Sequence, residues 1–246
     1  MSRLAVLAGL VRSLAIYLGR PDRTRAQARF YATLLRPGDL AFDIGAHMGN
    51  RSRALVQAGA RVVALEPQTI CLRVLRLTLP RAVVLVPRAV GATPGTARLQ
   101  VAPRHPTVTT LSTGFRQEAA ALPGFGHVDW SATQEVEVTT LDALIAAHGV
   151  PAYIKIDVEG HEAEVLAGLS QPVALVSLEV IPGLVPRFEA AVDRLQVLGP
   201  YRFNVARGEE AAFLFDDWLG RSALVDWLTG LPPGSKPCDV YARLTA

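Results

Sequence analysis

Several residue types are scarce in the 246-residue sequence, and each scarcity narrows the class of protein to which the chain can belong. There are two cysteines, Cys71 and Cys238, and two thiols so far apart predict no structural disulfide. We therefore expect a reducing, cytoplasmic setting. There are also only two lysines, Lys155 and Lys236, so arginine supplies nearly all of the positive charge. The net charge of +3 is small and no dense basic stripe is present, so we predict no nucleic-acid partner.

The sequence also lacks an apolar run long enough to suggest a membrane span. Near the N-terminus an apolar run over 4–11 is cut by Arg12, and no convincing signal-peptide cleavage site follows. The apolar residues of this region share one helical face: Leu4, Leu7, Val11, Leu14 and Leu18. We therefore predict an N-terminal helical extension over 1–36 and no transmembrane segment. Such a helix packs on the domain, lies on a membrane surface or forms a homodimer.

What the sequence does contain is typical of a well-buried globular core, since half of its residues are hydrophobic and 19% are charged. Strands are predicted at 40–44, 60–67, 82–91, 136–140, 152–160 and 173–180, and helices at 22–35, 50–59, 69–79, 141–149, 161–169 and 185–199. This alternation predicts βαβ units and a parallel sheet. We expect a single α/β domain over 1–246, with its core over 37–246.

In the middle and at the end of the chain, strands and helices are not predicted to alternate regularly. Residues 95–102 and 106–113 have the composition of strands and predict a β-hairpin or insertion around 95–135. Residues 114–131 have weak periodicity and several glycines and prolines, which favours a loop or lid. Residues 201–208, 211–218 and 238–244 are predicted to be closing strands.

A glycine turn, "FDIGAHMGN" at 42–50, follows the first strand. It does not match the phosphate loop GxxxxGK[ST]. It also departs from the dinucleotide pattern GxGxxG, because His47 and Asn50 occupy the second and third glycine positions. It does match D-x-G-x-x-x-G, through Asp43, Gly45 and Gly49. The turn should lie at the crevice outside the carboxyl ends of the strands, where ligands of such sheets bind.

Glu66, at the end of the second strand, is placed to accept hydrogen bonds from both hydroxyls of a ribose. Asp43 is placed to meet an ammonium group. A ligand with a ribose, an ammonium group and no pyrophosphate matches S-adenosylmethionine. The alternatives are a nicotinamide dinucleotide, as in an NAD-dependent oxidoreductase or epimerase, and a non-catalytic binding module.

A second polar cluster ends another apolar strand, in "YIKIDVEGHEAEVL" at 153–166. Burying Lys155 and Asp157 would cost several kcal/mol unless they pair or touch a ligand. Glu159 follows them, and Glu179 ends the next strand in "VSLEV". We expect these side chains to line the same crevice. Asp157 and Glu179 are a pair that could share a divalent ion, although we assign no metal site.

Six segments together resemble the FkbM family of S-adenosylmethionine-dependent methyltransferases: "FDIGAHMGNRS", "ARVVALEPQ", "PRAVG", "TTLDAL", "IKIDVEGHEAEVLAGL" and "VSLEV". The resemblance covers about 38–181. It implies a class I, Rossmann-like, doubly wound and mostly parallel seven-stranded sheet. It also implies S-adenosylmethionine as the cofactor and O-methylation of a small-molecule acceptor, a sugar or a natural-product hydroxyl.

The resemblance implies roles for particular residues. The expected cofactor-binding residues are Asp43, Gly45, Ala46, His47, Gly49, Asn50, Glu66, Pro67, Arg88, Ala89, Asp157 and Glu159. The expected catalytic residues are Asp157, His161, Glu179 and Lys155, with Asp157 as the first candidate for the base that takes the hydroxyl proton. The acceptor pocket is not implied by the resemblance.

Overall fold

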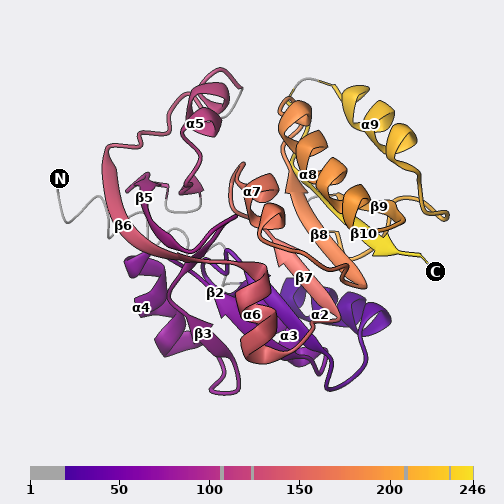
Figure 1. Ribbon diagram of the computed structural model, residues 1–246, viewed down its shortest axis with the longest axis horizontal. Coiled ribbons are helices and arrows are strands. Elements are labelled where there is room, and N and C mark those ends of the chain that lie inside the picture. Colours follow the sequence, from indigo (N-terminus) through magenta and orange to yellow (C-terminus); the bar gives the residue numbers. More distant parts are fainter. Residues whose placement is uncertain (1–19, 106–107, 123–124, 208–209, 233, 246) are drawn as a thin grey trace.

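The computed structural model describes residues 20–105, 108–122, 125–207, 210–232 and 234–245. Its centre is a seven-stranded sheet in the order β3-β2-β1-β7-β8-β10-β9 (Figure 1). The strands are β1 (Leu40–Ile44), β2 (Arg61–Leu65), β3 (Val84–Val86), β7 (Tyr153–Ile156), β8 (Leu175–Val180), β9 (Tyr201–Arg207) and β10 (Cys238–Leu244). Only β10 runs antiparallel to its neighbours. The predicted mostly parallel, seven-stranded α/β sheet is confirmed.

Helices cover both faces of this sheet, as Figure 1 shows. One face packs against α2 (Pro21–Leu34), α3 (Asn50–Gln57) and α4 (Thr69–Thr78). The other packs against α6 (Leu141–His148), α7 (Glu162–Ala167), α8 (Val185–Leu198) and α9 (Arg221–Thr229). Because every residue of β1 is buried, its sequence is apolar on both sides apart from one carboxylate.

The alternation of side chains along a strand explains where the polar residues of the sheet go. Phe42 and Ile156 belong to the core between the sheet and α6–α9. Asp43 and Lys155, which are register partners in β1 and β7, therefore point to the opposite face, toward α3. Ser177 of β8 continues this row, as the register partner of Lys155. The sheet thus carries one polar row on its α3 side.

The strand order reverses at β1, since β2 lies on one side of it and β7 on the other. In open α/β sheets, such a reversal leaves a crevice outside the carboxyl ends of the strands. The turn after β1, the residues after β2 and β7, and the end of β8 all lie at this edge. The fold therefore brings the glycine turn and the second polar cluster together.

The third predicted strand, over 82–91, is divided. Only β3 joins the main sheet, while β4 (Ala89–Val90) joins a second sheet with β5 (Gly95–Val101) and β6 (Ala132–Thr139), in the order β4-β6-β5. Pro87 lies between β3 and β4, and proline has no amide hydrogen for a ladder. The insertion is present, but β5 pairs with β6 across the whole segment instead of forming a hairpin with 106–113.

The predicted strand over 106–113 is wrong for the residues described, since Thr110 makes only a single bridge to Gln100. The predicted loop over 114–131 is wrong in its first part, which forms α5 (Thr113–Ala119). The Ser112 hydroxyl accepts a hydrogen bond from the Phe115 amide and begins this helix. Phe115 is fully buried, so tertiary packing stabilises a helix that local periodicity does not indicate.

The predicted strand over 211–218 is also wrong. This segment has no ladder of its own, and its Phe213 ring packs edge-on against Tyr241 and Phe30. The helix α9, which follows it, was not expected. The predicted N-terminal helix over 4–18 lies outside the described residues. Within the described part of the chain, no helix combines the length and apolar character needed to cross a membrane.

Candidate active site

A cavity of about 1060 Å³ opens at the carboxyl edge of the sheet. Most of the residues expected from the sequence line it together: Gly45, Ala46, His47, Asn50, Glu66, Pro67, Arg88, Ala89, Lys155, Asp157, Glu159, His161 and Glu179. Asp43 and Gly49 are not part of the lining. The site is thus assembled from segments far apart in the sequence, from Gly45 to Glu179, which the strand order makes neighbours.

The glycine turn is shaped by the backbone that passes beside it. Gly45 has a φ of 82°, and a Cβ atom there would lie 1.9 Å from the Asp157 carbonyl oxygen. Gly45 is therefore required by the approach of the β7 segment, and not only by a ligand as the sequence suggested. Gly49, with a φ of 75°, caps the start of α3 and faces Leu75 and Leu79.

Glu66 is buried at the end of β2, and backbone groups hold its carboxylate. Its two oxygens accept hydrogen bonds from the amides of His47, at 2.8 Å, and Gln68, at 2.7 Å. Burial raises the pKa of Glu66 to about 7, although these two hydrogen bonds lower it. Each carboxylate oxygen can accept a second hydrogen bond, so Glu66 retains acceptor capacity for hydroxyl groups of a ligand.

Asp43 lies behind the cavity instead of facing it. Its Oδ2 accepts a hydrogen bond from the Ser52 hydroxyl at 2.5 Å, and its Oδ1 lies 3.9 Å from the Lys155 ammonium nitrogen. Lys155 also lies 2.7 Å from the Asp157 carboxylate. Burial would lower the pKa of Lys155, but these two carboxylates raise it well above its usual value. Asp43 thus holds Lys155, and Lys155 holds Asp157.

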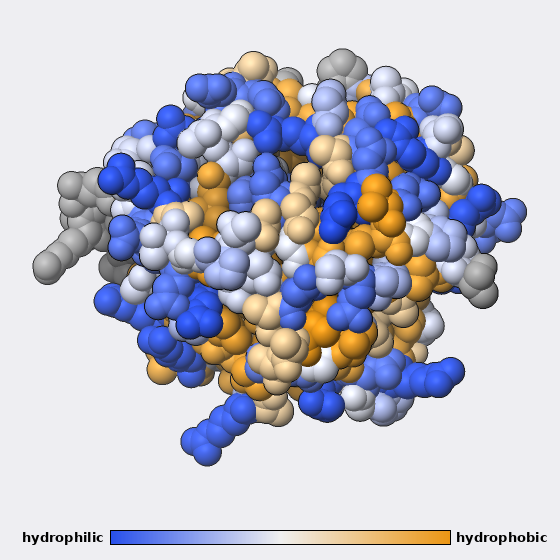
Figure 2. All heavy atoms as spheres, viewed as in Figure 1, coloured by the Kyte–Doolittle hydropathy of each residue, from blue (hydrophilic) through white to orange (hydrophobic). Residues whose placement is uncertain are grey.

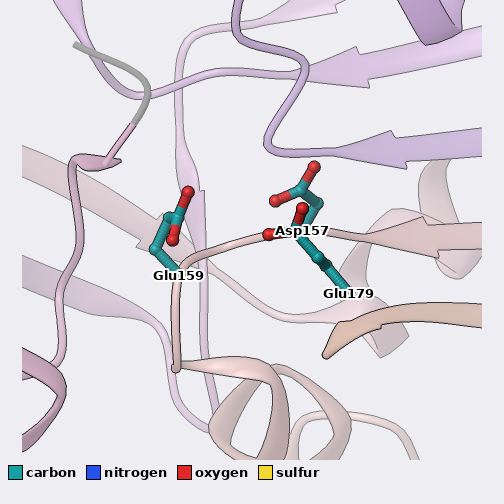
Figure 3. Close-up of side chains that lie close together, drawn as sticks. All are labelled: Asp157, Glu159 and Glu179. Atoms are coloured by element: carbon teal, nitrogen blue, oxygen red, sulfur yellow. The ribbon is translucent and has the colours of Figure 1, made fainter. Parts of the chain in front are cut away.

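Three carboxylates meet at the centre of the cavity: Asp157 and Glu159 after β7, and Glu179 near the end of β8 (Figure 3). One oxygen of each lies within 4.8 Å of the others. Burial raises the pKa of Glu159 and of Glu179 well above the usual range, and the Asp157 charge raises both further. Burial would also raise the pKa of Asp157, but the neighbouring Lys155 lowers it.

Carboxylate oxygens are ligands that Mg²⁺ and Ca²⁺ accept, so the three groups have the chemistry of a cation site. Glu159 supplies the third ligand that the sequence did not indicate beside Asp157 and Glu179. However, Lys155 already neutralises Asp157 at 2.7 Å. The cluster therefore carries less excess negative charge than three free carboxylates.

The backbone that carries Glu159 is held from two sides. Glu159 has a φ of 54°, and its carbonyl accepts a hydrogen bond from the Thr110 hydroxyl at 2.7 Å. Glu162 accepts hydrogen bonds from the amides of Val158 and Gly160, both at 3.2 Å. Its role is to close this turn, and burial raises its pKa to about 7. Thr110 belongs to the insertion, so that insertion supports the carboxylate cluster.

The remaining expected residues lie at the edges of the site. His161 lines the cavity, but its Nδ1 lies 3.6 Å from Glu164, and burial lowers its pKa. Burial also lowers the pKa of His47, to about 4, so its imidazole is neutral at pH 7. The Arg88 side chain is half exposed and donates a hydrogen bond to Glu137 at 2.7 Å.

Sequence reasoning missed several residues of the cavity wall. Arg51 of α3 lines it and forms a salt bridge of 2.8 Å with Asp239 of β10. Arg51 lies next to Asn50 in the glycine motif, so its place was open to prediction. The other missed residues come from α2, the start of α4, the insertion, β9, α9 and the segments that follow β9 and α9, and they include Arg23, Gln68, Thr109, Thr110, Arg207, Glu210, Trp227, Leu231, Pro232, Ser235 and Lys236.

Residues 43–196, more than half of the chain, match the model of the methyltransferase FkbM domain. The chain therefore belongs to the FkbM methyltransferase family, and it is an S-adenosylmethionine-dependent methyltransferase. The site suits that cofactor, which carries positive charge, because buried or half-buried carboxylates outnumber the one lysine among them. This assignment replaces the NAD-dependent alternative. No protein with a curated description matches the chain.

Solved methyltransferase structures resemble the model. An O-methyltransferase from Bacillus cereus, in complex with S-adenosylhomocysteine, covers 100% of this chain and 92% of its own at 13% identity, with a TM-score of 0.49. A precorrin-6y C5,15-methyltransferase from Geobacter metallireducens covers 89% of this chain and 86% of its own at 16% identity, with a TM-score of 0.44. Likenesses this distant say nothing about the substrate. The seven-stranded α/β sheet, together with the family match, gives the class I methyltransferase fold that the family resemblance implied.

Proposed function

We propose that this methyltransferase acts on oxygen and methylates a hydroxyl group of a small molecule, a sugar or another natural product. The observation that carries the proposal is the trio of Asp157, Glu159 and Glu179, which faces the cavity beside the glycine turn. A hydroxyl group needs a proton acceptor as it becomes a nucleophile, and carboxylates can serve as general bases.

Bound S-adenosylmethionine supplies an activated methyl group on a sulfonium. A new bond forms between the acceptor oxygen and that methyl carbon as the carbon–sulfur bond breaks and S-adenosylhomocysteine is released. The proton of the hydroxyl passes to a carboxylate of the trio. Because the sulfonium is already activated, much of the acceleration comes from holding the two reactants in line.

Glu179 is a better base than Asp157. A base is more effective when its pKa approaches the working pH, and the pKa of Glu179 is raised where that of Asp157 is lowered. Asp157 is bound to Lys155 at 2.7 Å, so its carboxylate is less basic. We therefore move Asp157 from base to orienting group. His161 also lines the cavity, but it is less deeply buried than the carboxylates. It is the third candidate for the base.

The cofactor roles follow the same geometry. Glu66 accepts the ribose hydroxyls, and Gly45, Ala46, His47 and Asn50 form the turn against which the cofactor lies. Pro67, Arg88 and Ala89, which line the cavity, would hold the adenine, and Asp157 and Glu159 would face the methionine part of the cofactor. Asp43 and Gly49 act indirectly, the first through Lys155 and the second through the start of α3.

The experiment is a methyl-transfer assay with radiolabelled S-adenosylmethionine against a metabolite extract. We expect labelled product from the wild type, a fall in turnover of about 100-fold or more in Glu179→Gln, and a smaller fall in Asp157→Asn. Glu66→Gln should instead weaken S-adenosylhomocysteine binding in calorimetry. Equal turnover in Glu179→Gln and the wild type would refute the base assignment. A chain that binds S-adenosylhomocysteine but labels nothing would be a binding module.

A further inference from the structure

One wall of the cavity is built by segments outside the family match. Arg23 comes from α2, Arg207 from the end of β9, Trp227 from α9 and Lys236 from the segment before β10. All four lie outside 43–196. The segment that matches the family therefore does not supply this wall of the cavity. A ligand that differs from one family member to another is suited to bind there.

The topology assigns this wall to the acceptor. The cofactor residues lie after β1 and β2, on one side of the strand reversal. The carboxylate trio lies after β7 and β8, in the middle. The ends of β10 and β9 come next along the same edge, with Asp239 of β10 beside Glu179 in register. A hydroxyl that reaches the trio from the side away from the cofactor must pass this wall.

The charges of the two sides differ in sign. Among the described residues of the wall, Arg23, Arg207 and Lys236 are exposed cations, and the exposed carboxylate beside them is Glu210. Asp239 also lies there, but its charge is balanced by Arg51 at 2.8 Å. The cofactor side and the centre carry the buried carboxylates instead. A ligand that spans the cavity therefore meets negative charge at its reacting end and positive charge at its far end.

The wall also offers a flat apolar surface. The Trp227 indole is half-buried, and Leu231 and Pro232 line the cavity after it. The Arg207 guanidinium carbon lies over the Trp227 ring, 5.8 Å from its centre, which places a cation against one face of the indole. A ring or carbon skeleton can pack on the indole while its anionic substituent meets Arg207.

We infer that the acceptor is a hydroxylated molecule with an anionic group, a carboxylate or a phosphate, which Arg23, Arg207 and Lys236 receive while its skeleton lies on Trp227. This inference rests on the proposed hydroxyl methylation. Opposite charges at the two ends of the cavity would orient the acceptor, so that its hydroxyl faces Glu179 and its anionic group faces away. The electrostatic part of this recognition weakens as ionic strength rises.

The test uses labelled S-adenosylmethionine, a metabolite extract and an anion-exchange column at pH 7. We expect the labelled product to be retained and to elute with salt. Phosphatase treatment before the column separates the two sources of charge, because it releases a phosphate ester and leaves a carboxylate. A labelled product that passes through unretained overturns the inference and leaves hydroxyl methylation in place. No labelled product at all contradicts the proposed function itself.

The double variant Arg207→Gln/Lys236→Gln tests the wall directly. We expect labelling of the extract to fall about tenfold or more, while the melting shift produced by S-adenosylhomocysteine stays at the wild-type value. The matched control is Arg73→Gln/Arg76→Gln on α4, which removes the same two charges away from the cavity. Equal labelling by the two double variants overturns the inference. A lost response to S-adenosylhomocysteine in the wall variant also overturns it, because the wall would then serve the cofactor.

Discussion

The two sides of the cavity are built in different ways. On the cofactor side, Gly45, Glu66 and Lys155 are held by backbone contacts, hydrogen bonds and ion pairs inside the fold. On the acceptor side, Arg207 and Lys236 are exposed. On the face of the molecule that Figure 2 views, hydrophilic and hydrophobic residues are intermingled. The cofactor side is thus part of the core, whereas the acceptor side can change with little cost to folding.

The two lysines give the strongest test of this difference. Lys155→Met should lower the free energy of unfolding by about 3–5 kcal/mol, because the buried carboxylates of Asp43 and Asp157 lose their cation. Lys236→Met, on the exposed side, should change it by about 0.5 kcal/mol or less. Urea denaturation of both variants measures this. If the two variants lost similar amounts of unfolding free energy, the two sides of the cavity would not differ in the way that their burial indicates.

A pair of glycines separates the cost of a close contact from the cost of backbone conformation. Gly45→Ala should lower the free energy of unfolding by about 4 kcal/mol, because the new Cβ meets the Asp157 carbonyl. Gly38 has a similar φ, 90°, but open space around it. Gly38→Ala should therefore cost only about 1 kcal/mol. Thermal denaturation of the two variants tests whether β7 presses on the turn.

The pH dependence of stability should report the buried carboxylate of the cofactor side. The folded pKa of Glu66 is about 7, above its ordinary 4.5, so the native state binds the proton more tightly than the unfolded chain. The stability from this group is present below about pH 4.5 and is lost as pH rises to about 7, a change of about 3 kcal/mol.

Glu66→Gln should remove the contribution of Glu66 to the pH dependence of the free energy of unfolding. Unfolding curves at pH 5, 6, 7 and 8 would show this change. Glu162, whose pKa is also about 7, contributes a slope of the same sign that remains in the variant. If the variant keeps the full wild-type slope, Glu66 is not the titrating group.

The smallest effect is expected where the insertion meets the core. Arg187 of α8 donates two hydrogen bonds to Glu118 of α5, at 2.6 and 2.9 Å, and one to Ser112 at 3.1 Å. Both partners are partly exposed, so Arg187→Lys should cost about 1 kcal/mol or less in unfolding. The Michaelis constant for the acceptor should rise more than that for the cofactor. A rise for the cofactor alone would place α5 on the other side of the cavity.

The sequence predicted which segments of the proposed cofactor side lie together, because their requirements are local. The glycine turn, the strand ends and the "KIDVEGHE" segment are short patterns in which residue type follows from backbone geometry. The errors fell where packing overrides local preference. Phe115 packs into the core and draws 113–119 into a helix, while Phe213 packs beside Tyr241 without joining a ladder. Neither contact has a signal in the neighbouring residues.

The sequence by itself determined the class of fold, the family and the segments proposed to meet the cofactor, because strand–helix alternation and the glycine turn are local properties of the chain. Only the tertiary structure decided what each charge does. The register of β1 against β7 places Asp43 beside Lys155 and turns it away from the cavity. Likewise, the return of β9 and β10 brings Arg207 and Lys236 to the same cavity as the carboxylates, across a separation in sequence that no local pattern records.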